Sequence, residues 1–436
     1  MVPHRDVTGR LFGGIRSPPM AAVTAPRRGA AARSWYALLV ALGVDNVGSG
    51  LFLPLALVYA TRAVGLPLAV AGTVVSVGTM AGLLVPPVAG RLVDRAGPRA
   101  VVILAQLVQA SGVSAYLVAD GVALTLVGAI LLAAGLQMFY CALFALIADV
   151  STEDPKDKPF ALVDMIRSGC FGLGALAAAG VLGSFGTAGL RIVVGVDAVT
   201  FVACALLLAL VVRAPHTRQQ SHEDTGEPRL GILRDRPFLA LIGVTASLAL
   251  ASDFFLVGIP VYVLEQLDGP AWLPGVMLAL LTVVLSVGGT ATVHATRRLA
   301  RTTTLAASGG LYVVWCALSL AAVFVAPGWL PTWLVGATLV QAAASLLFGT
   351  RANAIAEAAA PRDARGRYLA TFQYAFTVPQ AVAPAVVGLF TVGTWVPWAL
   401  VAAAAFLAMI GLRCLAPRLP PHAVVVSGHR RAVRSR

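Results

Sequence analysis

The chain has 436 residues, of which 58% are hydrophobic and only 12% are charged, and its mean hydropathy is +0.86. A water-soluble globular domain carries about twice that share of charged residues, so the composition excludes a soluble fold. The net charge of +13 would favour nucleic-acid binding in a soluble protein, but the placement of the basic residues, described below, argues against that function.

The first 34 residues are polar and contain six arginines together with several prolines and glycines. No apolar run precedes the first arginines, so this segment does not have the pattern of a secretory signal peptide. We expect residues 1–34 to form a disordered cytoplasmic tail. Translation starting at Met20 instead of Met1 is an open alternative.

Long apolar runs fill most of the chain after this tail. A membrane-spanning helix needs about 20 mainly apolar residues, and continuous rather than alternating apolar runs favour helices over a barrel. Polar or Gly/Pro-rich breaks divide the runs into twelve predicted spans. These spans lie near residues 35–60, 67–89, 100–119, 122–148, 160–184, 191–212, 237–264, 271–294, 303–326, 332–352, 367–391 and 394–416.

The longest polar break divides the twelve spans into six and six. We therefore predict an all-α membrane protein with two six-helix bundles. The bundles would occupy residues 35–212 and 237–416, joined by a cytoplasmic linker at 213–236 and followed by a basic cytoplasmic tail at 417–436.

The two halves match each other at a constant offset of 208 residues. Asp45 in the first span corresponds to Asp253 in the seventh. Ile147-Ala148-Asp149 at the end of the fourth span corresponds to Ile355-Ala356-Glu357 after the tenth. Several landmarks at one offset indicate a duplication, and two parallel six-helix repeats are typical of transporters that bind substrate at mid-membrane depth between the halves.

The basic residues are strongly biased to one side of the predicted bundle. Of the 32 lysines and arginines, 29 fall in the two tails and in the loops after even-numbered spans, while Arg62 and Arg191 fall on the other side. Cytoplasmic loops carry an excess of basic residues, so both termini are predicted to be cytoplasmic. We expect a multi-pass protein of the cell membrane that binds no nucleic acid.

Two acidic residues lie inside predicted spans at similar depth. Asp45 is ten residues into the first span, about 15 Å along a helix, and Asp253 has the same depth by the repeat. An intramembrane carboxylate is expensive and is a functional candidate by default. Loss of water disfavours the charged form, so protonation near neutral pH is expected. The alternative for each acid is a carboxyl group that only hydrogen-bonds between helices.

Further charged residues lie near the ends of spans. Asp197 is early in the sixth span and closer to the outer face, where we expect a structural role. Asp164 and Arg167 are three residues apart on the fifth span and share a face of the helix. They form either a local pair or part of a site for an anionic group.

Cysteine and histidine give no sign of a metal site or of catalysis. The five cysteines all fall in apolar segments, and the six histidines lie in tails, loops or a helix end, without metal-ligand spacing. The chain also lacks a Walker loop, an HExxH pattern and a Gly-x-Ser-x-Gly pattern. We therefore expect no metal, no cofactor and no enzymatic activity.

The sequence GRLVDRAGPR at residues 90–99 places several charges between two apolar runs. It resembles the signature loop between helices 2 and 3 of the major facilitator superfamily, a Gly-x-Leu-x-Asp-Arg-x-Gly pattern followed by basic residues. Pro98 stands where a basic residue is usual. The matching residues are Gly90, Leu92, Asp94, Arg95, Gly97 and Arg99.

This resemblance implies a cytoplasmic gate. In the family, the matching acid latches onto the start of helix 11, here near Arg367, and basic residues of the loop pair with an acid that ends helix 4, here Asp149. Glycines would permit the tight turn and close helix approach. The alternative is that the arginines only contact anionic lipid and fix the topology. The expected gate consists of Gly90, Asp94, Arg95, Gly97, Arg99 and Asp149.

The resemblance also implies where substrate binds. Helices 4 and 11 face the cavity in this family, so Gln137, Tyr140 and Gln373 are predicted to line it beside Asp45 and Asp253. Two features depart from the proton-driven drug antiporters of the family. Helix 4 lacks their arginine, and helix 5 lacks their Gly-Pro signature.

The expected function is secondary active transport, with proton-coupled export of small apolar or cationic compounds by alternating access, as in bacterial drug or metabolite exporters. Mid-membrane acids without fixed cations suit a neutral or cationic substrate and a carried proton. The alternative is proton-coupled uptake of a small metabolite, and a non-transporting sensor is a third candidate. The expected partners are a small-molecule substrate, protons and the lipid bilayer, and a single chain is expected to suffice for function.

Overall fold

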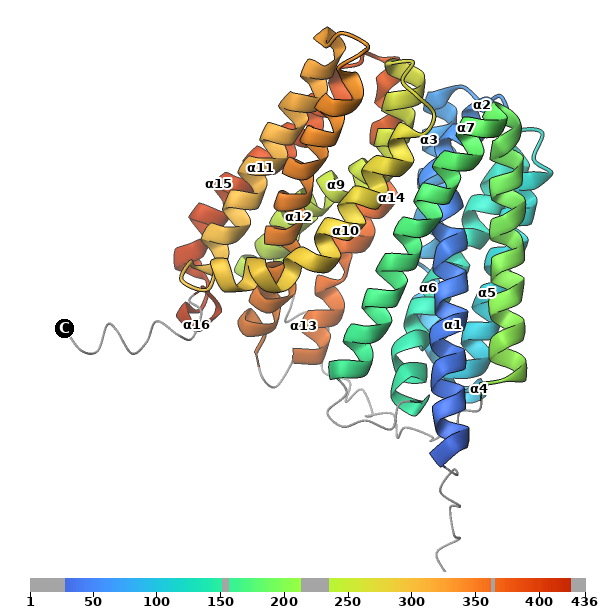
Figure 1. Ribbon diagram of the computed structural model, residues 1–436. Coiled ribbons are helices and arrows are strands. Elements are labelled where there is room, and N and C mark those ends of the chain that lie inside the picture. Colours follow the sequence, from blue (N-terminus) through green and yellow to red (C-terminus); the bar gives the residue numbers. More distant parts are fainter. Residues whose placement is uncertain (1–27, 151–156, 213–234, 362–364, 425–436) are drawn as a thin grey trace, which may run out of the picture.

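The computed structural model describes residues 28–150, 157–212, 235–361 and 365–424, and the regular structure in these ranges is helical throughout (Figure 1). The N-terminal half contains α1 (Arg28–Phe52), η1 (Leu53–Leu55), α2 (Ala56–Arg62), α3 (Leu68–Gly82), α4 (Pro86–Ala96), α5 (Pro98–Leu117), α6 (Val122–Val150) and α7 (Asp157–Leu210). The C-terminal half contains α9 (Arg236–Val261), η2 (Tyr262–Gln266), α10 (Leu273–Ala295), α11 (Arg301–Ala321), η3 (Ala322–Phe324), α12 (Leu330–Ala359), α13 (Arg365–Phe372), α14 (Tyr374–Gly388), η4 (Leu389–Thr391), α15 (Val396–Leu415), η5 (Ala416–Arg418) and α16 (Pro421–Val424).

These helices match the twelve predicted spans. In the described part of the chain, nine helices are long and apolar enough to cross a membrane, and α3 with α4 forms a further span that bends by 44°. α7 contains two of the predicted spans, separated at Gly186, and α10 has a shorter apolar stretch, Leu273–Gly289. The φ of +54° at Gly186 belongs to a backbone region that favours glycine, which explains the reversal there. The prediction of an all-α fold is confirmed.

Two boundaries differ from the expectation. α1 begins at Arg28, inside the segment expected to be a disordered tail, because alanines 30–32 are strong helix formers that extend the span. At the other end, η5 and α16 lie in the segment expected to be a basic tail. The linker at 213–236 falls almost entirely outside the described residues.

The helices form two bundles, one from each half of the chain (Figure 1). Figure 1 shows the start of α1, α4, α13 and α16 at one end of the molecule and α2 at the other end. We call the first end the terminal face and the second end the opposite face. By the excess of basic residues in its loops, the terminal face is the side predicted to be cytoplasmic.

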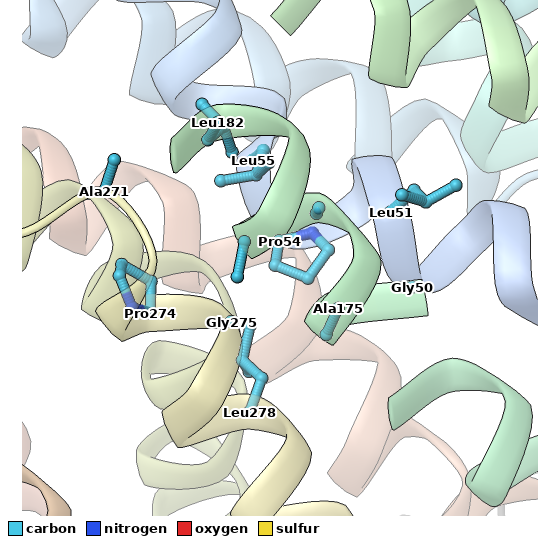
Figure 2. A pocket seen from close by; sticks show the side chains of 12 residues that line it. Gly50, Leu51, Pro54, Leu55, Ala175, Leu182, Ala271, Pro274, Gly275 and Leu278 are labelled. Atoms are coloured by element: carbon cyan, nitrogen blue, oxygen red, sulfur yellow. The ribbon is translucent and has the colours of Figure 1, made fainter. Parts of the chain in front are cut away.

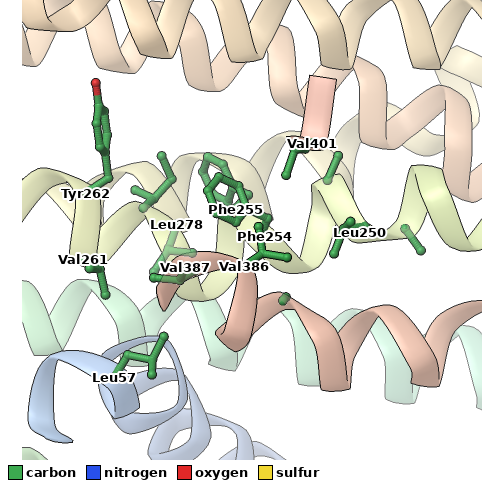
Figure 3. Close-up of a cluster of buried hydrophobic side chains, with 14 of the residues drawn as sticks. Leu57, Leu250, Phe254, Phe255, Val261, Tyr262, Leu278, Val386, Val387 and Val401 are labelled. Atoms are coloured by element: carbon green, nitrogen blue, oxygen red, sulfur yellow. The ribbon is translucent and has the colours of Figure 1, made fainter. Parts of the chain in front are cut away.

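Among the described residues, one cluster of apolar side chains continues from one half into the other. A large cluster of buried side chains joins Leu57 and Phe201 of the N-terminal half to Phe254 and Tyr262 of the C-terminal half. Figure 3 shows Leu57 of α2 on one side of this cluster, and Phe254 of α9 on the other. A second cluster is confined to the part of the N-terminal half that is nearer the terminal face. Its members include Leu38, Val102, Leu146 and Leu208.

Direct contacts join the halves near the opposite face. The backbone N–H of Ala385 donates a hydrogen bond to the Ser76 hydroxyl (2.8 Å), and Gly72 lies so close to the Pro384 carbonyl that a Cβ atom at position 72 would collide with it. Small residues allow helices to approach closely in membranes. On α10, Gly275 likewise lies against the Ala175 carbonyl of α7. We call these two close helix pairs, α3–α14 and α7–α10, the seam between the halves.

Candidate functional site

A cavity that is open to solvent lies between the two halves. Its walls come from η1, α2, α3, α5 and α6 on one side and from α9 and α14 on the other. The lining residues are Leu53, Ala56, Leu57, Val75, Thr79, Tyr116, Ala129, Leu132, Ala133, Leu136, Asp253, Leu256, Val257, Gln380, Ala383 and Pro384.

Asp253 is the charged residue of this lining. Its side chain is half-buried near the middle of α9, and it makes no hydrogen bond or ion pair with the described residues. Gln380 adds an amide, while the Thr79 hydroxyl donates within its own helix to the Val75 carbonyl (2.9 Å). Buried charges in proteins are normally paired, so an unpaired carboxylate on an apolar cavity wall is available to bind a proton or a cation.

A hydrogen-bonded chain fixes α9 next to Asp253. The hydroxyl groups of Ser252 and Tyr312 lie 2.7 Å apart, and Tyr312 also lies 3.1 Å from the Ser345 hydroxyl. Ser345 in turn donates to the side-chain carbonyl of Gln341 (2.8 Å). The chain connects α9, α11 and α12, so the wall that carries Asp253 belongs to a rigid part of the C-terminal half.

Asp45 has a different environment. It is only 5% exposed and lies inside the N-terminal half, where Asn46 Nδ2 donates to its Oδ2 atom (3.1 Å) and to the Leu42 carbonyl (2.9 Å). It does not belong to the lining of the cavity. The repeat therefore places the two acids at similar positions along their helices, but only Asp253 faces the space between the halves.

Asp197 of α7 lies near Asp45, a proximity that the sequence did not reveal. Asp197 is 1% exposed, and each of the two carboxylates lies within the other's electrostatic range. Gly48 of α1 packs directly against the side chains of Asp197 and Thr200. The sequence feature that could have indicated this proximity is Gly48, three residues after Asp45, because glycine permits close helix approach.

The other residues predicted to line the cavity lie outside its wall. Tyr140 of α6 is 38% exposed and accepts a hydrogen bond from Arg167 Nη2 of α7 (2.8 Å), whose guanidinium lies 5.1 Å from the centre of the Tyr140 ring. Gln137 is half-buried and Gln373 is exposed. The side chain of Asp164, the expected partner of Arg167, lies outside the described side chains. A substrate role for Gln137, Tyr140 and Gln373 stays a prediction.

The expected gate loop forms the junction of α4 and α5. Gly97 has φ +85°, a conformation that favours glycine, and Pro98 begins α5. Arg99 donates from Nε to the Leu208 carbonyl (3.1 Å) and from Nη2 to the Ala209 carbonyl (2.6 Å), so it caps the C-terminal end of α7. In this structure the loop is thus anchored within the N-terminal half.

Asp94 and Arg95 are exposed on the terminal face, and Asp94 makes no hydrogen bond or ion pair in the described part of the chain. A Cβ atom at Gly90 would meet open space. Asp149 is half-buried at the end of α6, and the side chain of Arg367 lies outside the described side chains. The latch between the loop and helix 11 stays a prediction.

Arg62 and Glu265 form a contact between the halves that the sequence alone did not indicate. Arg62 Nε lies 2.5 Å from the Glu265 carboxylate, and Nη2 donates to the Leu264 carbonyl at the same distance. Both residues lie at the opposite face, at the ends of the first and seventh spans. The pair thus bridges the halves on the side away from the gate loop.

A smaller recess of about 240 Å³ lies where α1, η1 and α7 meet α10 (Figure 2). Its lining consists of glycine, alanine, leucine and proline, including Pro54, Ala175 and Gly275. These side chains offer no charge and no hydrogen-bonding group. The recess is therefore a gap in the seam between the halves rather than a recognition site.

Two bundles of membrane-spanning helices, one from each half of the chain, that meet around a cavity are the architecture of membrane transporters built from repeats. The sequence profile of the Major Facilitator Superfamily matches residues 38–323, and the chain belongs to this family. No curated protein sequence matches the chain. Membership and fold together support secondary transport by a multi-pass membrane protein.

Solved structures of transporters share the fold. The chain is similar to the nucleoside transporter NupG, with a TM-score of 0.75 and 12% identity over 88% of this chain and 99% of that chain. It is also similar to a bacterial homologue of the iron transporter ferroportin in an inward-facing state (TM-score 0.72, 16% identity, 88% and 98% coverage). A peptide transporter, POT, in complex with sulfate gives a TM-score of 0.69 with 15% identity over 91% of this chain and 99% of that chain.

Proposed function

We propose that this protein is a proton-coupled exporter of small apolar or cationic compounds in the cell membrane, working by alternating access. The observation that carries the proposal is the unpaired carboxylate of Asp253 on the wall of an otherwise largely apolar cavity between the halves. Apolar walls favour a hydrophobic body, and the single acid favours one positive charge or one proton.

Exchange of a cationic substrate for a proton follows if both compete for the carboxylate of Asp253. An ionised Asp253 without a partner is unfavourable at low dielectric, so the site is stable when either a proton or a cationic substrate neutralises it. Binding of one then requires release of the other. If each exchange occurs on a different side of the membrane, the result is antiport. Asp45 is proposed as a second acid that changes its bound ion during the cycle.

The conformation described above is proposed to be open toward the cytoplasm, with both termini on that side. Three features support this: the seam between the halves lies near the opposite face, Arg62 and Glu265 bridge that face, and Asp94 is exposed. Similarity to a transporter homologue in an inward-facing state supports the same assignment. The proposed gate, formed by Gly90, Asp94, Arg95, Gly97, Arg99 and Asp149, would close the terminal face in the other half of the cycle.

The proposal is tested by binding of radiolabelled tetraphenylphosphonium, a lipophilic cation, to the purified protein in detergent. Asp253→Asn removes the charge but keeps the shape, so we expect affinity for the cation to fall at least about tenfold, equivalent to about 1.4 kcal/mol. Binding of a neutral apolar compound of similar size is expected to change little.

Asp120→Asn serves as the matched control, because Asp120 is an exposed acid on a loop outside the cavity. This variant is expected to bind tetraphenylphosphonium like the wild type. Cation affinity that is equal in wild type and Asp253→Asn would remove the acid from the site. A preference for polar metabolites over every lipophilic compound would favour uptake instead.

A further inference from the structure

A polar layer interrupts the apolar core of the N-terminal half. On α1, Asp45 lies between Leu42, which belongs to the cluster near the terminal face, and Leu51, which belongs to the cluster shared with the C-terminal half. On α5, Gln106 lies at the same junction of the two clusters. Asp197 of α7 completes the layer. Three helices thus place polar side chains at one level where the surrounding core is apolar.

The two carboxylates of this layer are close to each other. Asp45 and Gly48 are three residues apart and share a face of α1. A Cβ atom at position 48 would lie only 2.6 Å from Asp197 Oδ1 and would also collide with the Thr200 hydroxyl. The absence of a side chain at Gly48 therefore lets α7 bring Asp197 and Thr200 against α1, next to Asp45. The Thr200 hydroxyl donates to the Asp197 main-chain carbonyl (2.8 Å) and lies 3.5 Å from Asp197 Oδ1, and the lone pairs of the hydroxyl oxygen stay available.

Gln106 is an independent sign that something binds here. Its side chain is 0% exposed, and its amide lies close enough to the Asp45 carboxylate to interact with it, but neither the Nε2 atom nor the Oε1 atom makes a hydrogen bond of normal length and angle. A buried amide whose hydrogen bonds are incomplete is costly, and such groups in native structures often mark a bound ion or water or a functional role. By contrast, the neighbouring Asn46 amide is hydrogen-bonded.

The fixed charges around this polar layer are compatible with a bound cation. The positive charge of Arg167 lies within electrostatic range of Asp45. Its guanidinium, however, donates a hydrogen bond to the Tyr140 hydroxyl and packs on the rings of Phe139 and Tyr140. Besides Asp197, the buried thiol of Cys204 lies within the electrostatic range of Asp45, and the Cys170 thiol packs against Gly43 on the same helix. Two ionised carboxylates in a low-dielectric interior repel each other strongly unless a cation lies between them or one of them takes up a proton.

We propose that Asp45, Asp197 and Gln106 form a site for a hard metal cation, sodium or calcium, inside the N-terminal half. The site offers two carboxylates, the carbonyl oxygen of Gln106 and the hydroxyl of Thr200. Hard cations prefer such all-oxygen ligand sets, and calcium accepts them in flexible geometry. The set contains only two acids and comes from three separate helices, which is why no spacing pattern in the sequence indicated a metal.

This inference deepens the proposed function, on which it rests for the idea that Asp45 exchanges an ion during the cycle. Metal and proton would be alternatives at Asp45. The site is separate from the cavity that contains Asp253, so cation binding can be measured without any transport substrate. Failure of the metal site would leave substrate binding at Asp253 untouched, and the reverse is equally true.

The test is the melting temperature of the purified protein in chelator-treated detergent buffer, titrated with sodium chloride or calcium chloride. Choline chloride and magnesium chloride at matched ionic strength serve as controls. We expect one of the two cations to raise the melting temperature by about 5 °C at concentrations well above its dissociation constant. Asp197→Asn and Gln106→Leu are each expected to increase the half-saturating concentration at least about tenfold. Asp253→Asn, an acid of the other half, should retain the wild-type response.

Equilibrium dialysis with radioactive sodium or calcium provides a second measurement that does not depend on unfolding, with one ion per wild-type chain as the expected result. Equal binding by wild type and Gln106→Leu would place the ion elsewhere. If neither cation binds the wild type or changes its melting temperature, the acids share a proton and the metal site does not exist.

Discussion

Asp253 and Asp45 show how the surroundings of a carboxylate decide what it can do. Asp253 faces solvent-connected space and lacks a partner, so a ligand that enters from the cavity can reach it directly. Asp45 is enclosed by its own bundle and shares its surroundings with Asp197 and Gln106, so a substrate in the cavity does not reach it directly. These surroundings are the reason for proposing a substrate role for the first acid and an ion-binding role for the second.

Asp94 allows a prediction that separates gating from stability. In the present conformation its side chain is exposed and unpaired, so Asp94→Asn should change the free energy of unfolding by no more than about 0.5 kcal/mol. In the proposed closed state Asp94 would make charge-assisted hydrogen bonds worth about 1.5–3 kcal/mol. We therefore expect normal insertion and melting temperature, but turnover reduced by roughly tenfold or more.

The measurement is transport into vesicles that contain equal amounts of inserted protein, with Asp120→Asn as the control for an exposed acid on the other face. Wild-type turnover in Asp94→Asn would show that the loop does not act as a gate and would leave its arginines with a role in topology alone.

At the residue scale, the sequence predicted some side chains well and others poorly. Asp45 and Asp253 were recognisable because ionisable residues are rare within apolar runs. The partner of Asp45 was not recognisable, since Asp197 lies about 150 residues away and depends on how α1 packs against α7. For the same reason Gln106 looked like any other polar residue of a span.

At the scale of helices, glycines determine where the two halves can meet. Gly72 of α3 faces the Pro384 carbonyl of α14, and Gly275 of α10 faces the Ala175 carbonyl of α7. Each pair joins a helix of one half to a helix of the other. Because the contact is between backbones, even one added carbon forces the helices apart, and the seam near the opposite face is sensitive to small changes.

Gly72→Ala tests this seam. The added Cβ atom would collide with the Pro384 carbonyl, so the variant is expected to lose about 1–3 kcal/mol of stability in this conformation. Gly195→Ala is the matched control, because a Cβ atom at Gly195 meets nothing within 4 Å. A lower melting temperature is expected for Gly72→Ala only. Equal melting temperatures for the two variants would mean that the halves do not pack at Gly72 as described.

The positions of the helices were predictable from the sequence, but their breaks were not. Apolar runs of sufficient length indicated all twelve spans. The bend between α3 and α4, the division of the first span at Pro54 and the reversal at Gly186 depend on local backbone geometry. The seam between the halves was also unpredictable, because the glycines that form it resemble the many glycines that meet nothing.

At the scale of the whole molecule, the contacts between the halves are concentrated toward the opposite face. The shared apolar cluster, the Arg62–Glu265 pair and the Ser76–Ala385 hydrogen bond join the halves toward the opposite face. The separate cluster of the N-terminal half and the exposed gate loop lie toward the terminal face. Rocking one half against the other would break the first set of contacts and form a new set at the terminal face, which is how alternating access works in transporters built from repeats.

The proposed function requires that substrate and protons exchange through the cavity that contains Asp253. The most direct measurement uses inside-out vesicles with an acidic lumen and a pH-sensitive dye, to which lipophilic cations and neutral apolar compounds are added. We expect the compounds to cause proton release from wild-type vesicles, and this release to be lost in Asp253→Asn. A separate arm with Asp45→Asn reports whether the buried acid is also needed. Wild-type protein that is folded and inserted, yet moves no protons with any compound, would contradict proton-coupled export, and release that survives Asp253→Asn would contradict the site.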